Sequence, residues 1–377
     1  MPLLPSWFTV QVAFAPLPVP FFRALREIEV ETSIGQASIF RLHFDLSRTM
    51  LGDFDALAID IFRPMLPVRI SIAAGVPVPQ VLINGYILDS QVHAAGSPGS
   101  SRYEVVGMDA LGALMANNQI PFPWPNLSDT EIAATIFTKY AMIPIVDDLP
   151  STRTMLDTTT NQHIYDAPFL FDLAHCNNLE LYIQPDPLAG TDVGHLHRPN
   201  TFLPSQGVLS VDFGRQTNLT QFNVSNDMLK PTGVMGATVD QQTRATVPAF
   251  GQASTEMPMG REPTLSRILP PPVARQIAGC AANPTEAQLR ALAHASATSR
   301  SVTAQGEVDG IKFGRPLVVG LPVLVRGAGL QNSGLYYVKS VTHRISRDDY
   351  SQSFTAWRNA VGLTGTEVFI DPLEPVS

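Results

Sequence analysis

Runs in which apolar and polar residues alternate occupy both ends of this chain. Such alternation places successive side chains on opposite faces of an extended strand. The first block of runs comprises residues 28–33, 37–47, 68–74, 81–95 and 101–109. The later runs comprise residues 207–214, 220–227, 315–327, 334–346 and 349–358. Because the runs are short and separated by turn residues, each block predicts an antiparallel β-barrel that is closed or nearly closed.

Short turn signals add detail to these blocks. Gly35 lies between the first two runs and predicts a hairpin. Asn84-Gly85 lies inside a long run and indicates a bulge or bend, and Asp348-Asp349 predicts a hairpin tip. With 32 prolines, 26 glycines and only 15% charged residues, the composition favours short strands and turns over a helical bundle.

Helical patterns are concentrated in residues 109–200. A short helix is expected over 109–117, and Ser128 with Glu131 forms the pattern of a capping box before a second helix. One face of that second helix carries Ile132, Ile136 and Tyr140. These features predict a small α/β domain inserted between the two β blocks.

A helix followed at once by a strand is the clearest unit of this insert. Asp166 is placed to cap a helix over residues 166–176, and Asn177 or Asn178 is placed to end it in a left-handed turn. The apolar stripe of this helix consists of Phe169, Leu170, Leu173 and Ala174. Alternation over 179–184 then predicts a half-buried strand. The unit predicts packing and carries no obvious chemistry.

The fold class predicted from these patterns is mainly β with an α+β insert. The expected domains are a first barrel at 1–108, the insert at 109–200, a second barrel at 201–362 and a tail at 363–377. Within the second barrel, the proline-rich residues 240–282 are expected to form an extended, partly flexible excursion on the surface. An alanine-rich helix is expected over 283–298, and its small side chains indicate close packing on a neighbour.

Charge and hydropathy exclude several classes of function. A net charge of −8 argues against a basic groove that binds nucleic acid. A hydrophobic content of 45% leaves more apolar surface than a free monomer favours, which indicates an assembly. The apolar N-terminus is interrupted by prolines and has no basic start, so it is a poor signal peptide. No run reaches the roughly 18 uncharged apolar residues that span a bilayer. We expect a soluble protein without membrane insertion.

Histidines and cysteines offer few chemical sites. His195 and His197 are two apart on a predicted strand and can face the same side, but no residue with ligand spacing completes a metal site. Cys176 adjoins the apolar stripe, so a buried free thiol is expected for it rather than a disulfide with Cys280. His175 and Cys176 cannot pair as base and nucleophile, because adjacent helical residues point about 100° apart.

The acidic pairs and the tryptophans offer no clear site either. Asp147-Asp148 and Asp348-Asp349 could suggest a glycosidase, but both pairs lie in predicted solvated turns without an apolar pocket. Three tryptophans are too dispersed for a sugar-binding or base-stacking platform, namely Trp7, Trp124 and Trp357. The remaining histidines are expected to be structural, namely His43, His93, His163, His294 and His343. We therefore predict no catalytic, cofactor-binding or metal-binding residue, and no cofactor.

Several segments occur in the order found in one known family. They are residues 101–117, 128–140, 161–183, 194–200 and 306–345. The third carries the pattern FL-x-x-LA-x-x-N-x-x-ELY, and the last carries G-x-YYV-type strand residues followed by V-x-H. In this order the chain resembles the late control protein D family, the baseplate hub proteins of contractile phage tails and related injection systems. The fold of that family is shared with the first part of VgrG-type spikes.

This resemblance implies a structural role in a homotrimer. Two tube-protein-like barrels in each subunit would place six similar barrels around a channel and adapt the sixfold tail tube to the threefold spike. The implied partners are the tail tube protein, a separately encoded spike and other baseplate proteins. The implied location is a virion baseplate or injection-system particle assembled in the bacterial cytoplasm.

Other functions and settings stay open at this point. An enzyme is the first alternative, as a tail-associated cell-wall hydrolase with its site in residues 109–200. A glycan-binding tail module is the second alternative. The sequence fits a phage, a phage-tail-like bacteriocin and an effector-delivery machine equally, and it fits a lumen that passes DNA or protein.

Overall fold

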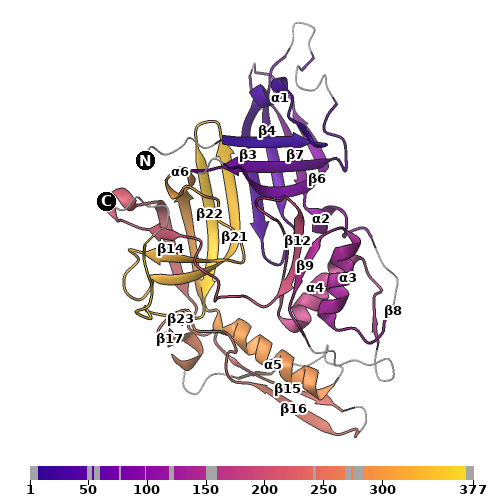
Figure 1. Cartoon of the computed structure of the whole chain (residues 1–377), viewed down its shortest axis with the longest axis vertical. Helices are drawn as coiled ribbons and strands as arrows, with labels where there is room; N and C mark the ends of the chain where they lie inside the picture. The colour runs from indigo at the N-terminus through magenta and orange to yellow at the C-terminus, as the bar shows by residue number, and fades with distance from the viewer. Residues whose placement is uncertain are drawn as a thin grey trace.

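The computed structural model describes residues 7–48, 53–54, 60–75, 78–97, 99–118, 123–149, 159–240, 243–267, 273–275 and 283–370. Two β-barrels lie against each other, with a helical insert beside them and a helix-covered hairpin at the lower end of the view (Figure 1). The predicted fold, mainly β with an α+β insert, is confirmed.

The first barrel is an antiparallel ladder that wraps around one core. In ladder order its strands are β3 (Leu25–Ser33), β4 (Ile39–Leu46), β7 (Ser101–Met108), β6 (Gln80–His93), β5 (Pro67–Ala73) and β1 (Trp7–Val12). Residues from all of these strands share a single buried apolar cluster, as the alternation predicted. After β1 come β2 (Ala15–Pro16) and α1 (Val19–Ala24), and Phe21 of α1 enters the same core.

The irregularities of β6 lie away from the predicted position at Asn84-Gly85. The register between β5 and β6 slips beside Leu82, and the register between β6 and β7 slips beside Leu88. Gly85 stays in register and leaves room for the Phe40 ring, since an ideal Cβ on this glycine would lie 2.7 Å from it. This glycine therefore marks close packing and not a bulge.

The second barrel repeats this construction. In ladder order its strands are β14 (Leu219–Asn226), β19 (Val302–Asp309), β22 (Tyr350–Arg358), β21 (Gly334–Ser346), β20 (Pro322–Arg326) and β13 (Val208–Ser210). The backbone N–H of Ser210 donates to Oδ1 of Asn218 at 2.7 Å, which draws the ends of β13 and β14 together. Asp348 and Asp349 lie at the exposed tip between β21 and β22, as predicted. Strand β19 was not predicted, although Val302, Ala304 and Val308 alternate with polar residues and are buried.

A backbone ladder joins the two barrels. β3 pairs antiparallel with β21, from Ser33 opposite Ser340 to Glu27 opposite Ser346. The strands of both barrels therefore form one 13-stranded sheet, visible where β3 meets β21 in Figure 1. This shared ladder fixes the orientation of one barrel relative to the other through main-chain hydrogen bonds.

The insert is a small sheet with helices on one face. Its elements are α2 (Ala110–Ala113), β8 (Pro123–Trp124), α3 (Asp129–Lys139), β9 (Ile143–Val146), β10 (Thr160–Asn161), α4 (Asp166–Asn177), β11 (Glu180–Pro185) and β12 (Asp192–His197). The sheet order is β11-β12-β9. The predicted capping box is present: Ser128 Oγ accepts from the Glu131 N–H at 3.2 Å, and Glu131 Oε2 accepts from the Ser128 N–H at 2.7 Å.

Helix α4 ends as predicted but begins differently. Asn178 adopts the left-handed conformation at φ 51° and stops the helix. The N-cap is Tyr165, so the prediction that Asp166 caps the helix is wrong. Asp166 is fully buried and accepts hydrogen bonds from Lys139 Nζ at 2.8 Å and from Tyr140 Oη at 2.7 Å. Its carboxylate thus ties α4 to the end of α3.

An ordered hairpin lies in the region predicted as a partly flexible excursion. It is formed by β15 (Gly233–Val239) and β16 (Thr246–Gly251), with β18 (Val273–Arg275) parallel to β15 and α5 (Pro284–Ser299) packed across it. We call these four elements the arm. Strands at 246–251 and 273–275 were not expected in this excursion. The prediction of a close-packed helix is confirmed, because Ala287, Ala291 and Ala295 form the arm's core with Val234 and Ala249.

The remaining elements are short. They are β17 (Glu262–Pro263), β23 (Ala360–Val361), α6 (Gly310–Phe313) and 3-10 turns at 214–216 and 264–267. Within the described ranges, no helix has both the length and the apolar character needed to cross a membrane.

Substitution of Gly251 by valine should loosen the arm. An ideal Cβ at this position would lie 2.1 Å from the Ala291 carbonyl oxygen, so α5 must move away from β16. We expect a loss of about 2 kcal/mol in arm stability, the usual cost of overpacking. Faster hydrogen exchange confined to 284–299 would report it. Phe250→Val, at an exposed neighbouring position, is the control and should leave exchange unchanged.

Candidate functional site

Strand β11 lies where the insert meets the second barrel. Leu181 and Ile183 face the helices of the insert, as predicted, but Glu180 and Tyr182 on the opposite face are buried as well. The prediction of a half-buried strand is therefore wrong. Tyr182 belongs to the core of the second barrel, and Gly320 admits it, since an ideal Cβ there would lie 2.3 Å from the Tyr182 hydroxyl.

A cluster of polar residues forms at this contact, where the insert, the second barrel and the arm meet. We call it the junction cluster, and it consists of Glu180 (β11), Glu256 (after β16), Arg300 (after α5), Tyr337 (β21) and Trp357 (β22). The Tyr337 hydroxyl donates to Glu180 Oε2 at 2.6 Å. Arg300 Nε donates to Glu256 Oε1 at 3.0 Å, and the guanidinium carbon lies 4.7 Å from the centre of the Trp357 ring.

Burial controls the acidity of this cluster. Glu180 is 5% exposed, and burial raises the pKa of its carboxyl to about 7, against a smaller opposing effect of Arg300. Burial, reinforced by the neighbouring Glu180, also raises the pKa of the Tyr337 hydroxyl. Both groups therefore favour their neutral forms in the folded protein.

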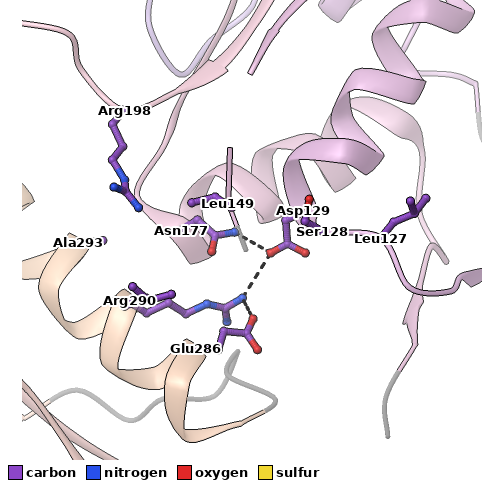
Figure 2. A pocket seen from close by; sticks show the side chains of 10 residues that line it. Leu127, Ser128, Asp129, Leu149, Asn177, Arg198, Glu286, Arg290 and Ala293 are labelled. Atoms are coloured by element: carbon purple, nitrogen blue, oxygen red, sulfur yellow. Dashed lines mark hydrogen bonds and ion pairs between the residues drawn. The ribbon is translucent and has the colours of Figure 1, made fainter. Parts of the chain in front are cut away.

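A crevice lies between the insert and α5. Figure 2 shows Arg290 of α5 reaching toward Asp129 at the start of α3, beside Glu286. Arg290 Nη2 lies 3.5 Å from Asp129 Oδ2 and also pairs with Glu286, and Asn177 Nδ2 donates to Asp129 Oδ2 at 2.7 Å. The enclosed volume is about 40 Å³, which suits water better than a substrate. We interpret the crevice as a polar joint between insert and arm.

The insert also contacts the first barrel. Arg69 Nη2 donates to the Gly190 carbonyl at 2.8 Å, and Asn84 Nδ2 donates to Asp192 Oδ1 at 2.9 Å. Burial raises the pKa of the Asp192 carboxyl. The insert thus contacts the first barrel, the second barrel and the arm through separate sets of residues, and it connects these three modules.

The structure brings His195 and His197 together, as their spacing indicated. His195 Nδ1 lies 3.1 Å from His197 Nε2, and the His195 ring stacks on Tyr182 with centroids 4.3 Å apart. Burial, followed by the effect of His197, lowers the pKa of His195 to about 3. In the part of the chain that the structure describes, no third histidine, cysteine or acid joins them to form a metal-binding group. The pair serves the packing of β12 against Tyr182.

The acidic pairs and the tryptophans lie apart from one another. Asp147 Oδ2 accepts from the Arg198 N–H at 2.9 Å, and Asp148, Asp348 and Asp349 are exposed. Trp124 and Trp357 are buried in different cores, and the side chain of Trp7 lies outside the described set.

The predictions for the two cysteines have different outcomes. Cys176 is partly exposed, so the expectation of a buried thiol is wrong. Cys280 lies outside the described residues.

The junction cluster was not found from the sequence. Glu180 falls in the polar phase of an alternating strand, which normally faces solvent. Arg300 and Glu256 lie in segments predicted as a helix end and a loose excursion. No short motif links these residues, because the three segments meet only in the folded chain.

Comparison with solved structures identifies the fold. Searches of known protein families and of curated proteins return no match. A tail protein from Neisseria meningitidis superimposes with TM-score 0.65 at 12% identity, over 94% of this chain and 97% of that one. The 43 kDa tail protein of prophage MuSo2 from Shewanella oneidensis gives TM-score 0.64 at 13% identity, over 93% and 98%. A component of the Escherichia coli type VI secretion system gives TM-score 0.57 at 13% identity, over 93% and 76%.

These matches extend over nearly the whole chain. The protein therefore has the fold of phage tail proteins, a fold that also occurs in a type VI secretion component. The fold implied by the resemblance to late control protein D is confirmed.

Proposed function

We propose that this chain is the structural baseplate hub of a contractile phage tail or a related injection system. Three copies form a ring that adapts the sixfold tail tube to the threefold spike. The shared ladder between β3 and β21 is the observation that carries the proposal. Because it holds two barrels of similar construction side by side in every chain, a trimer supplies six barrels in fixed orientation around an axis.

The ends of the large sheet are suited to contacts between subunits. Among the described strands, β14 pairs on one side with β19 and has no ladder partner along its other edge. Thr220, Gln221, Asn223 and Ser225 on this strand are exposed, and the strand contains no charge or proline that would protect an edge. At the opposite end of the sheet, β2 covers only the last residues of β1. The β14 edge of one copy contacts the β1–β2 end of the next copy, and repetition of this contact closes the ring.

The proposed partners follow from this role. The ring contacts the tail tube protein on one side, the spike on the other and further baseplate proteins at its rim. It belongs to a virion baseplate or injection-system particle assembled in the bacterial cytoplasm. We also propose that residues 1–108, 109–200 and 201–362 are its three domains.

We propose that the chain catalyses no reaction. The polar clusters described above join modules, and the hollow beside Arg69, Asn84 and Asp192 measures about 170 Å³, which is smaller than an ordinary ligand pocket. The junction cluster is enclosed by three modules, and the crevice around Arg290 holds about 40 Å³. Asp147 is engaged by Arg198, and Asp348 and Asp349 are solvated at a hairpin tip, so neither acidic pair considered from the sequence is placed for hydrolysis.

The first test is the solution mass of the purified chain by light scattering, with negative-stain images of the same peak. We expect a particle of three times 40.9 kDa with a central hole. A chain that stays monomeric alone and in the presence of its spike protein would contradict the proposal. Clearing of cell-wall suspensions that is lost in Asp147→Asn would favour the hydrolase instead.

Positive charge on the free edge of β14 should prevent ring assembly. We expect the double variant Asn223→Lys with Ser225→Lys to lower the trimer fraction at least about tenfold while the melting temperature of the monomer is kept, because edge lysines oppose strand pairing. Analytical ultracentrifugation measures the fraction. Asp348→Lys, at an exposed hairpin tip, is the matched control. An unchanged trimer fraction in the double variant would show that β14 does not lie in the interface between subunits.

A further inference from the structure

Glu180 occupies an unusual position in the junction cluster. It is 5% exposed and belongs to the insert, but its carboxyl faces away from the insert's own core. The residue opposite it on β12 is His197, and the next residue on the same face of β11 is Tyr182. Its direct hydrogen-bond donor is the Tyr337 hydroxyl of β21, at 2.6 Å. This bond is a link between the insert and the second barrel.

The cluster contains two carboxylates for one arginine: Glu180 is buried, and the side chains of Glu256 and Arg300 are 9% and 15% exposed. Arg300 already binds Glu256 through Nε, at 3.0 Å to Oε1 and 3.2 Å to Oε2. The arginine therefore acts on Glu180 only through space, and Glu256 acts on it with the opposite sign. Lys339 on β21 adds a further through-space attraction. A charged Glu180 would be buried without an ion pair of its own, which is costly in a protein interior.

We propose that Glu180 is a proton-controlled latch between the insert and the second barrel. With a proton on the carboxyl, β11 stays docked against β21, because the neutral group fits the site and keeps the Tyr337 bond. When the proton leaves, the uncompensated charge favours separation of β11 from β21 and hydration of the carboxylate. The latch is a property of the single chain, so it goes beyond the proposed hub function and does not depend on it.

The direction and size of the effect follow from proton linkage. Burial raises the pKa of Glu180 from its ordinary 4.5 to about 7 in the docked state. The docked state therefore holds the proton more tightly, so docking is strongest at acid pH and weakens as pH rises from 4.5 to about 7. With these values the ratio of open to docked molecules rises about tenfold between pH 6 and pH 8.

Hydrogen exchange tests the latch in the intact chain. Peptides covering 180–185 and 334–346 are followed at pH 6 and pH 8, with the intrinsic pH dependence of exchange removed. We expect protection in these peptides to fall about tenfold at pH 8 in the native protein and to stay constant in Glu180→Gln, which imitates the neutral carboxyl. Peptides from β5 and β6 serve as an internal reference. Glu307→Gln, an acid on β19, is the control and should behave like the native protein.

A second variant keeps the test decisive if Glu180→Gln does not fold. The Tyr337 hydrogen bond lowers the pKa of Glu180, so Tyr337→Phe should move the midpoint of the exchange change to higher pH. The latch is overturned if native protection is equal at the two pH values, if Glu180→Gln shows the same tenfold change, or if the midpoint in Tyr337→Phe stays in place or falls.

Discussion

Replacement of Leu170 by aspartate should unfold the insert. Leu170 is fully buried in the core that α3, α4 and the β11-β12-β9 sheet share. The change removes a buried isobutyl group and leaves an unpaired carboxylate in its place, which together cost about 5 kcal/mol. This is comparable to the total stability of a small domain. Urea unfolding followed by circular dichroism, with limited proteolysis of residues 159–200, measures the loss.

The matched control places a charge on the same helix at a position open to solvent. Pro168 is exposed in the first turn of α4, where an acidic side chain is favoured by the helix dipole. Pro168→Glu should therefore melt like the native protein. Native-like melting and trimer yield in Leu170→Asp would show that the core of the insert is assigned incorrectly.

Replacement of Arg358 by methionine should destabilise the second barrel by about 3 kcal/mol. The side chain is fully buried at the end of β22. Nη1 donates to the Ser333 carbonyl at 3.0 Å, while Nη2 donates to the Met259 carbonyl at 3.1 Å and the Gly362 carbonyl at 3.0 Å. Methionine fills much of the volume but leaves two buried carbonyl groups and one partly buried carbonyl group without these donors.

Chemical denaturation at constant pH measures this loss, and two further variants define its cause. Arg344→Met alters an arginine of β21 whose side chain is 49% exposed and whose carboxylate partner, Glu29, lies 3.7 Å away. It should change stability by less than about 0.5 kcal/mol. Arg358→Lys keeps the charge but cannot reach all three carbonyls, so an intermediate loss is expected. Equal stability of Arg358→Met and the native chain would contradict the bridging role.

Much of the local structure was predictable because its causes lie within a few residues. The capping box of Ser128 and Glu131, the left-handed stop at Asn178 and the alanine face of α5 depend on neighbours along the chain. Strands β3 to β7 of the first barrel followed from alternation alone. Failures occurred where a distant partner changed the environment. Asp166 has the sequence position of a cap, but Lys139 of α3 binds it inside the core.

The sequence by itself determined most strands of the two barrels, most of the helices and the mainly β class, because periodicity and end signals act locally. Only the tertiary structure decided which strand edges pair and which polar faces are covered. The β3–β21 ladder joins segments from opposite ends of the chain, and backbone pairing carries no side-chain signature of its partner. Glu180, Arg290 and Arg358 look like ordinary surface residues in the sequence. In the folded protein they connect separate segments, because groups from those segments enclose them and replace water as their hydrogen-bonding and ionic partners.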